Sequence, residues 1–306
     1  MSGDLEARLR RILDEKYHHR HPFNLRLHGG QCSPAEVRRW IANRYYYQTR
    51  IPLKDGLILT KSEDREFRRG WIRRIHDHDG DGTRAGGLEL WLRLAEAAGL
   101  DRAEVASLRR VLPGVRRACD AYVEFVASHD LLASVASSLT ELAAGAFLGE
   151  RAEAFRKHYG WIEEAGLAYF LSRTTQAPRD AEEGLAFVLE HARSSGEEAR
   201  CEAALLRKCE ILWALLEGVE WGGKVPRLAP AALLRAEGET LAVLPERAVR
   251  ISESGKAILA ACDGARDVEA VAAEVRRPHP EDERVERDVY DFIERMEALG
   301  VLRLDK

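Results

Sequence analysis

The sequence has few of the features that would tie it to a membrane, to nucleic acid or to an oxidising compartment. Its five cysteines are scattered and include no CxxC pair, so we expect buried, reduced thiols rather than disulfides or a nucleophile. No apolar window reads as a membrane span, and a charged segment rather than an apolar signal core follows Met1. These absences predict a cytoplasmic protein. With 47 basic and 51 acidic residues the net charge is −4, which supplies no general attraction for nucleic acid or anionic lipid.

Two segments contain possible metal ligands but lack the spacing that a metal site needs. His18, His19 and His21 form no i, i+4 pair and no HExxH motif, so a packed or ligand-facing role is expected before metal ligation. Residues 77–82 alternate acids with glycine but lack the closing glutamate of an EF-hand loop. We therefore expect no metal. His78, in this segment, is either a structural cation at a helix end or a catalytic group.

The remaining pattern is helical. Hydrophobic residues make up 45% of the chain and recur every three or four positions, which predicts a mostly helical protein. The short loops favour antiparallel neighbours in a bundle whose interior can hold a ligand. After a first helix that starts at Ser2 or Asp4 and ends near Tyr17, and an irregular histidine segment before Pro22, later helices are expected at about 88–98, 113–128, 131–149, 152–172, 180–194 and 197–216.

One helix mixes polar and apolar residues on a single face. It begins at a capping box, Ser33–Glu36, with proline at its first position. The 3.6-residue period then aligns the side chains of Trp40, Arg44, Gln48 and Ile51. This face is either an ordinary amphipathic surface from which Arg44 reaches water, or one wall of a pocket for a polar ligand.

Pro52 predicts that this helix kinks or stops near Ile51 and turns Lys54 toward the same space. Another helix is expected at about 64–77, ended by the glycines of residues 80–82. Tyr169 and Arg173 are spaced i, i+4 and project together, either as a surface pair or as part of a site. Other polar residues on otherwise apolar helix faces are Tyr122, Thr140, Glu141 and Lys208.

The helical pattern breaks at residues 221–226, which we interpret as a linker between domains of residues 1–220 and 227–306. The second domain carries the net negative charge and resembles a small α+β winged helix. Because it lacks a basic recognition helix, peptide binding by strand addition is favoured over DNA binding. Strands are expected at about 232–236, 240–244, 248–251 and 301–304, and helices at about 254–262, 268–275 and 283–299.

Several motifs occur in an ordered series. They are Tyr17-His18 with His21-Pro22, the run from Asn43 to Asp55, Asp77-His78-Asp79-Gly80, Val111-Leu112-Pro113-Gly114-Val115-Arg116, Ser137-Ser138-Leu139-Thr140-Glu141-Leu142, and His158-Tyr159 with Trp161-Ile162. Over about residues 5–220 they resemble the pyrroloquinoline-quinone (PQQ) synthase family. The tail, with Leu244-Pro245-Glu246, Ile251-Ser252-Glu253, Ile258-Leu259 and the run from Asp263 to Val268, resembles the small peptide chaperone of the same pathway.

The resemblance implies an all-α, heme-oxygenase-like helical bundle that binds no heme and forms a homodimer. It implies ring closure and O2-dependent oxidation of a bicyclic quinoline precursor to PQQ, with release of hydrogen peroxide and without any cofactor. The tail would bind the precursor peptide and present it to the radical SAM enzyme of the pathway. His78 would be the general base, Tyr169 and Arg173 the oxygen site, and His18 a further catalytic residue. Substrate-binding residues would be Tyr17, Arg44, Gln48, Lys54, Arg74, Tyr122, Thr140, Glu141, Arg151 and Lys208.

The chain departs from the family pattern at one position of the oxygen site. The family motif Phe-Ala-Pro-x-Ile-His ends in an imidazole, whereas Leu148 stands at that place here. A leucine can neither donate a hydrogen bond nor carry a proton, so either a neighbouring group takes over or the late oxidation steps are slower. We expect slower late steps.

Two other functions stay open. The bundle could be a carrier that retains the precursor or PQQ without turnover. Related thiaminase-like bundles suggest a hydrolase, but that chemistry requires a placed cysteine or carboxylate pair, and the matched stretches contain no cysteine. Release of peroxide in the presence of the precursor would separate the oxidase from the carrier.

Overall fold

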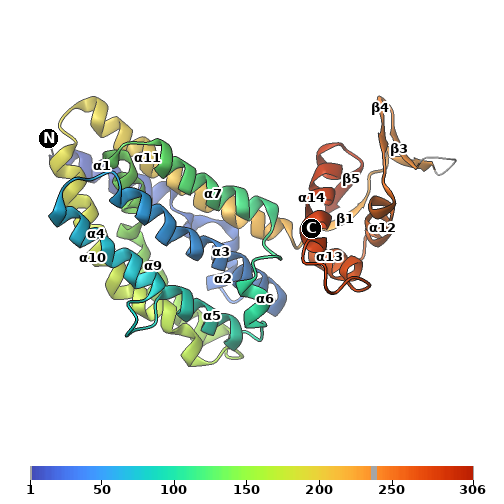
Figure 1. Cartoon of the computed structure of the whole chain (residues 1–306), viewed down its shortest axis with the longest axis horizontal. Helices are drawn as coiled ribbons and strands as arrows, with labels where there is room; N and C mark the ends of the chain where they lie inside the picture. The colour runs from blue at the N-terminus through green and yellow to red at the C-terminus, as the bar shows by residue number, and fades with distance from the viewer. Residues whose placement is uncertain (1, 236–239, 306) are drawn as a thin grey trace. The chain divides into compact units, whose positions relative to one another are not determined.

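The computed structural model of the chain describes residues 2–235 and 240–305 (Figure 1). It divides into two compact units, one of Met1–Ser107 with Val115–Glu217 and one of Leu108–Gly114 with Gly218–Lys306. The first is a helical bundle and the second a small α+β unit, so the predicted fold classes are confirmed.

The helical unit is built from long helices joined by short turns. Their polar faces point outward, whereas apolar side chains such as Leu9, Trp40 and Phe170 are almost fully buried. Short 3-10 helices, His18–Arg20, Ser138–Thr140 and Glu164–Leu167, separate some of them. The α-helices are α1 (Ser2–Lys16), α2 (Pro22–His28), α3 (Pro34–Leu59), α4 (Arg65–Asp79), α5 (Gly87–Ala97), α6 (Arg102–Ala106), α7 (Pro113–Ser128), α8 (Leu131–Ser137), α9 (Glu141–His158), α10 (Ala168–His191) and α11 (Ser195–Trp221).

Helix α3 starts as predicted and ends later than predicted. The Ser33 hydroxyl accepts from the Glu36 amide at 3.3 Å, and the Glu36 carboxylate accepts from the Ser33 amide at 2.8 Å. The prediction was a kink or a stop near Ile51, and the stop is wrong, because the helix continues through Pro52 to Leu59. Side chains beyond the proline, including Lys54 and Ile58, are buried, so their packing outweighs the one hydrogen bond that a proline removes.

The boundaries of the helices after residue 130 also differ from the prediction. The helix expected at 131–149 is interrupted by the 3-10 turn, and α9 then runs on to His158. The helix expected at 152–172 does not exist as one element, and α10 instead continues through Pro178. Gly145 of α9 explains why the proline fits: a Cβ there would lie 2.9 Å from Pro178 Cγ, so the glycine makes room for the proline ring.

By length and composition, the stretch Leu131–His158 is apolar enough to cross a membrane, contrary to the expectation that no window reads as a span. It is a weak indication, because 56% of its most apolar window is buried inside the protein. A core helix of a bundle has the same composition.

The histidine segment is more regular than predicted. Residues 18–20 form a 3-10 helix, and His21 caps α2 by accepting from the Phe23 amide at Nδ1, 3.1 Å away. Helix α6 was not predicted. The five cysteines are free and buried, as expected.

Within its described residues, the second unit contains two antiparallel sheets and three helices. Strand β1 pairs with β5, and β2, β3 and β4 form a sheet in that order. The predicted helices and strands are confirmed within a few residues; the last residue of the first predicted strand, Ala236, lies outside the described residues, and β1 was not predicted. The elements are β1 (Val225–Leu228), β2 (Leu233–Arg235), β3 (Leu241–Leu244), β4 (Arg247–Arg250), α12 (Glu253–Ala261), α13 (Val268–Arg276), α14 (Val285–Ala298) and β5 (Leu302–Asp305).

Candidate active site

A cavity lies inside the helical unit. Helices α3, α9 and α10 supply most of its wall, and the rest comes from the turn after α1, the end of α4, α5, the 3-10 helix Ser138–Thr140 and α11. Most of the lining side chains are polar or aromatic. They are Tyr17, His18, Arg44, Tyr47, Gln48, Ile51, His78, Trp91, Thr140, Glu141, Ala144, Phe147, Leu148, Arg151, Tyr169, Arg173 and Leu212.

Helix α3 presents its mixed face to this cavity. Gln48 is buried, and its Oε1 accepts from the Tyr169 hydroxyl at 2.9 Å, while its Nε2 has no hydrogen-bond partner among the described residues. The Arg44 guanidinium lies 3.7 Å from the centroid of the Tyr47 ring. An unpartnered buried amide beside a cation needs a polar ligand or water to satisfy it, so the pocket interpretation of this face is favoured over the amphipathic-surface interpretation.

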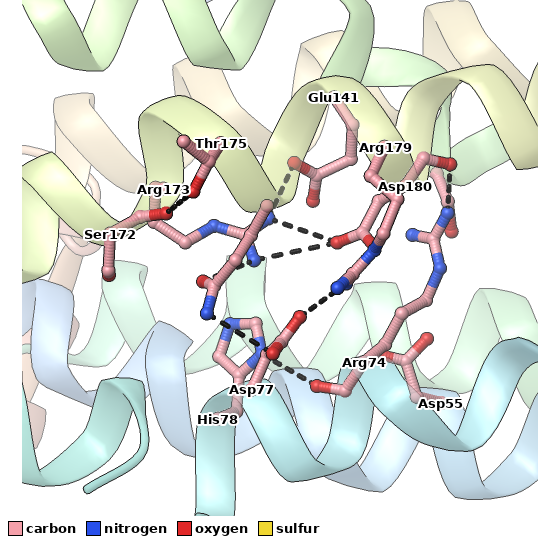
Figure 2. A network of polar contacts seen from close by, with 12 residues as sticks. Asp55, Arg74, Asp77, His78, Glu141, Ser172, Arg173, Thr175, Arg179 and Asp180 are labelled. Carbon is pink, nitrogen blue, oxygen red and sulfur yellow. Dashed lines mark hydrogen bonds and ion pairs between the residues drawn. The ribbon is translucent and has the colours of Figure 1, made fainter. Parts of the chain in front are cut away.

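His78 sits at the end of α4 with its ring buried (Figure 2). Its Nδ1 is 3.0 Å from the Arg74 carbonyl oxygen. Since a carbonyl only accepts, Nδ1 carries the proton and Nε2 keeps its lone pair. Burial and the nearby Arg173 charge lower the pKa of His78 to about 4. The ring is therefore a neutral base at physiological pH.

The Arg173 cluster, which we define as His78, Glu141, Arg173 and Asp180, contains a charge that is compensated inside the protein (Figure 2). Arg173 Nη2 lies 2.8 Å from Glu141 Oε2 and 3.5 Å from Asp180 Oδ2. These carboxylates raise the pKa of Arg173 although burial opposes it. The guanidinium is thereby fixed in charge and position.

Further residues contact the Arg173 cluster and hold Asp180 in place. Arg179 pairs with Asp77 and, at 2.6 Å, with Asp180. The Arg74 guanidinium donates to the Asp180 backbone carbonyl and lies 4.0 Å from the centroid of the Trp71 ring. The Asp180 pKa is held low by these cations, although burial opposes it.

The Arg151 cluster, defined as Asn24, His28, Arg44 and Arg151, contains charge that is not compensated. Arg151 has only neutral partners, namely Asn24 Oδ1 at 2.7 Å, His28 Nε2 at 3.2 Å and the rings of Trp40 and Phe147. Among the described residues no carboxylate lies within ion-pair distance of it. Burial and the Arg44 charge lower the pKa of Arg151 to about 9.

The imidazole of His18 lines the same cavity. It is buried, and Nδ1 has no hydrogen-bond partner in the part of the chain that the structure describes. Burial, with Arg44 and Arg151, holds the pKa of His18 well below its usual range. Burial raises the pKa of the adjacent Tyr17 phenol, so both groups are neutral and free to exchange hydrogen bonds with a ligand.

The cavity wall includes ten of the fourteen residues that the sequence analysis singled out. The other four lie behind it. Lys54 contacts Asp55 at 2.6 Å and Ser138 at 3.0 Å, and the Tyr122 hydroxyl is 3.3 Å from Ser138 Oγ. Lys208 donates to the Tyr47 hydroxyl at 2.7 Å, and Arg74 points to Asp180. Helical spacing predicts which face a residue occupies, but not how deep behind its neighbours it lies.

Sequence reasoning missed several lining residues. Tyr47 belongs to the aromatic run of α3, and its position three residues after Arg44, on the same helix face, could have suggested a role. Trp91, Phe147 and Leu212 look like ordinary core residues, and nothing local distinguishes them. Leu148 does line the cavity, so the departure from the family motif concerns the wall itself.

No group of three or more histidine, cysteine, aspartate or glutamate side chains that could hold a metal ion occurs within residues 2–235 and 240–305. In the acidic loop, Asp81 is engaged locally: its Oδ1 accepts from the Thr83 amide at 2.9 Å and from the Arg84 amide at 2.8 Å. Its oxygens therefore organise a turn.

The arrangement of the helices defines the fold. The helical unit has a heme-oxygenase-like fold. It is similar to a domain with that fold from Shewanella denitrificans, with a TM-score of 0.57 and 14% identity over 71% of this chain and 89% of that one. A TenA homologue from Pseudomonas syringae matches with a TM-score of 0.56 and 14% identity, over 71% and 92%.

Sequence comparisons identify the family. Residues 6–217 match the TENA/THI-4/PQQC family, and residues 233–302 match Coenzyme PQQ synthesis protein D (PqqD). The pyrroloquinoline-quinone synthase of Rhizobium meliloti is 48% identical over 233 residues, covering 76% of this chain and 91% of that protein. The synthase of Gluconobacter oxydans is 45% identical over 230 residues, covering 75% and 96%. The chain belongs to the TENA/THI-4/PQQC family and carries a PqqD region after the family's bundle.

Proposed function

We propose that the helical unit is an oxidase of PQQ biosynthesis that closes the last ring of the bicyclic quinoline precursor and oxidises it with O2 to PQQ. The names of its relatives and the PqqD match support a role in this pathway. The observation that carries the proposal is the cavity itself, in which uncompensated cations, Arg44 and Arg151, share a wall with a neutral base, His78. A carboxylate-rich substrate needs cations to bind it, and removal of carbon-bound protons needs a neutral base.

In this proposal His78 Nε2 accepts the proton that leaves carbon as the ring closes and as each oxidation begins. The substrate supplies the electrons. In each O2-dependent step a quinol gives two electrons and two protons to O2, which becomes hydrogen peroxide, and the quinol becomes a quinone. Because the quinol carries the electrons, the reaction requires no metal or flavin to store them.

The oxygen site would lie beside Arg173 and Tyr169. Both line the cavity, and a fixed cation with a neighbouring hydroxyl stabilises the anionic oxygen species that forms during reduction. The Tyr169 hydroxyl points to Gln48, so its orientation is set. Leu148, also in the wall, offers no hydrogen bond there, which supports the proposal that the late oxidation steps are slow in this chain.

The test is turnover of the precursor with and without air. Aerobic incubation is expected to yield quinone absorbance and hydrogen peroxide, and anaerobic incubation is expected to stop before the first O2-dependent oxidation. Product capture in a one-to-one ratio without peroxide would instead support a carrier. Failure of the chain to bind or change the precursor at all would overturn both.

We propose that the second unit binds the precursor peptide by adding it to a sheet edge and presents it to the radical SAM enzyme of the pathway. Among the described residues β2 and β4 are the outer strands of their sheet, and Leu233 and Leu234 on β2 are 62% and 48% exposed. An outer strand offers unpaired backbone groups to an extended peptide.

The direction of each backbone amide in the outer strands shows how to test strand addition on the full chain. The Ile251 amide donates to the Thr240 carbonyl, so alternation turns the amide of Ala248 away from β3, to the open edge of β4. Ala248→Pro removes that donor while the ladder to β3 is kept, and Leu234→Pro does the same at the edge of β2. The variant that loses peptide binding identifies the edge. Strand addition is wrong if both bind as the native chain does.

We also propose that the protein works as a cytoplasmic homodimer, on the resemblance to its family. Analytical ultracentrifugation of the full chain tests the dimer. A monomer at micromolar concentration would contradict it.

A further inference from the structure

Asn24 joins two walls of the cavity although it does not line the cavity itself. It lies on α2 with 1% of its surface exposed. Its Nδ2 donates to the His18 backbone carbonyl at 2.7 Å, and its Oδ1 accepts from Arg151 Nη2 at 2.7 Å. One amide therefore fixes both the turn that carries His18 and the guanidinium that α9 projects.

His28, one turn further along α2, supplies a second acceptor to the same arginine. Its Nε2 is 3.2 Å from Arg151 Nε, and its ring stacks on Phe147 with centroids 4.8 Å apart. An arginine N–H can only donate, so Nε2 is unprotonated. Burial and the Arg151 charge lower the pKa of His28 to about 3, which keeps the ring a neutral acceptor over the physiological range.

The choice of neutral partners has an electrostatic consequence. Two neutral acceptors hold a guanidinium in place without cancelling its charge, whereas a carboxylate would hold it and cancel it. Arg44, nearby, contacts the Tyr47 ring and likewise has no carboxylate partner in residues 2–235 and 240–305. The unpartnered Nδ1 of His18 and Nε2 of Gln48 line the same space, so charge and hydrogen-bonding capacity are both left for a ligand.

We propose that Asn24 and His28 are positioning residues that hold Arg151 through neutral acceptors only, and that this neutrality reserves the cation for a carboxylate group of the ligand. The inference rests on the proposed function, because it assigns part of that substrate's recognition. In this proposal Asn24 and His28 lie outside the cavity wall, yet their neutrality determines which ligands bind in the cavity.

Acidic and neutral replacements separate charge from contact. Asn24→Asp keeps an oxygen beside Arg151 but cancels the charge, and His28→Glu does so from the other side. His28→Gln keeps a neutral acceptor. Asn43→Asp is the matched control, because Asn43 is also a buried asparagine whose Nδ2 donates to a backbone carbonyl, that of Arg39, and it does not line the cavity.

The readout is equilibrium binding of PQQ and of benzene-1,3,5-tricarboxylate to the full chain, with circular dichroism and thermal melting to verify folding. Asn24→Asp and His28→Glu are expected to weaken binding of both by about tenfold or more, the usual contribution of a hydrogen bond to a charged group. His28→Gln and Asn43→Asp are expected to bind within about threefold of the native chain.

The inference is overturned if both acidic variants bind the tricarboxylate as the native chain does, or if His28→Gln loses as much as His28→Glu. If Asn24→Asp does not fold, the two His28 variants decide. A native chain that binds the tricarboxylate but not PQQ would overturn the proposed function, while the acidic variants would still decide the role of Asn24 and His28. A native chain that binds neither overturns both.

Discussion

Arg151 and Arg173 are both buried, and both line the same cavity, but the protein surrounds them differently. Arg173 has Glu141 and Asp180 beside it and its pKa is raised, whereas Arg151 has an amide, an imidazole and aromatic rings, and its pKa falls to about 9. A buried charge is costly unless something compensates it. Arg173 finds that compensation within the fold, and we propose that Arg151 finds it in a ligand.

The comparison separates two tasks within one cavity. In the proposed reaction the fixed, compensated charge orients the groups that carry out chemistry, and His78 lies in that cluster. Uncompensated charge creates affinity for anions at the expense of stability. Substitutions on the two sides should therefore change different measured quantities.

The largest expected effect is on catalysis. His78→Asn removes the neutral base but leaves both arginines, so turnover of the precursor should fall by about 10²- to 10⁴-fold, the usual contribution of a positioned base. Binding of PQQ should change little. Product absorbance under saturating precursor checks the first and a titration the second. If the His78→Asn variant is still active, His78 is not the base.

Arg173→Met should reduce stability strongly. It leaves Glu141 and Asp180 without their shared cation, and breaking a buried ion pair costs about 3 kcal/mol or more. Urea denaturation followed by circular dichroism measures the free energy of unfolding. If the loss is below about 1 kcal/mol, the carboxylates are not compensated by Arg173, and the contrast with Arg151 disappears.

Arg151→Met should give the opposite pattern. It removes an uncompensated buried cation, so the free energy of unfolding should stay within about 1 kcal/mol of the native value. PQQ affinity should drop by about tenfold or more. The same denaturation and titration experiments apply. A variant that is strongly destabilised but binds normally would reverse the roles that we assign to the two arginines.

Acid should destabilise the helical unit through its buried neutral histidines. The pKa of His78 is lowered to about 4 and that of His28 to about 3, whereas an unfolded histidine titrates near 6.5. Below pH 6.5 the histidines bind protons in the unfolded chain but not in the native chain. The free energy of unfolding is therefore highest above pH 6.5 and falls as the pH approaches 4. The slope is at most about 1.4 kcal/mol per pH unit for each histidine. Unfolding of the native chain and of His28→Gln between pH 4.5 and 7.5 measures it, and an unchanged slope in the variant would contradict the contribution of His28.

The smallest expected effect is a gain. Leu148→His adds an imidazole to the cavity wall near the proposed oxygen site, so oxygen consumption with the precursor should rise by about tenfold or less, at the low end of what one added donor contributes. An oxygen electrode measures it. No gain, or a native chain already as fast as relatives that have the histidine, would show that a neighbouring group does this work.

Local signals predicted much of the fold. The capping box of α3, the glycine end of α4 and the order of elements in the second unit follow from short-range backbone chemistry and periodicity, and these were confirmed. Two of the failures lie at Pro52 and Pro178, where the local rule predicts or favours a break. Tertiary packing decided both, because the buried neighbours and the space at Gly145 stabilise more than a missing hydrogen bond costs.

The sequence by itself determined which residue types face the interior of the bundle, because helical spacing and the family motifs both depend only on the order of the residues. Only the tertiary structure decided that Lys54 and Lys208 lie behind the wall, that Arg173 meets two carboxylates and that Arg151 meets none. Glu141, Tyr47 and Asn24 reach their cations from other helices, whereas Asp55 and Asp180 lie on the same helix as the cation they contact. Electrostatic compensation depends on distances in space, which no local pattern of residues specifies.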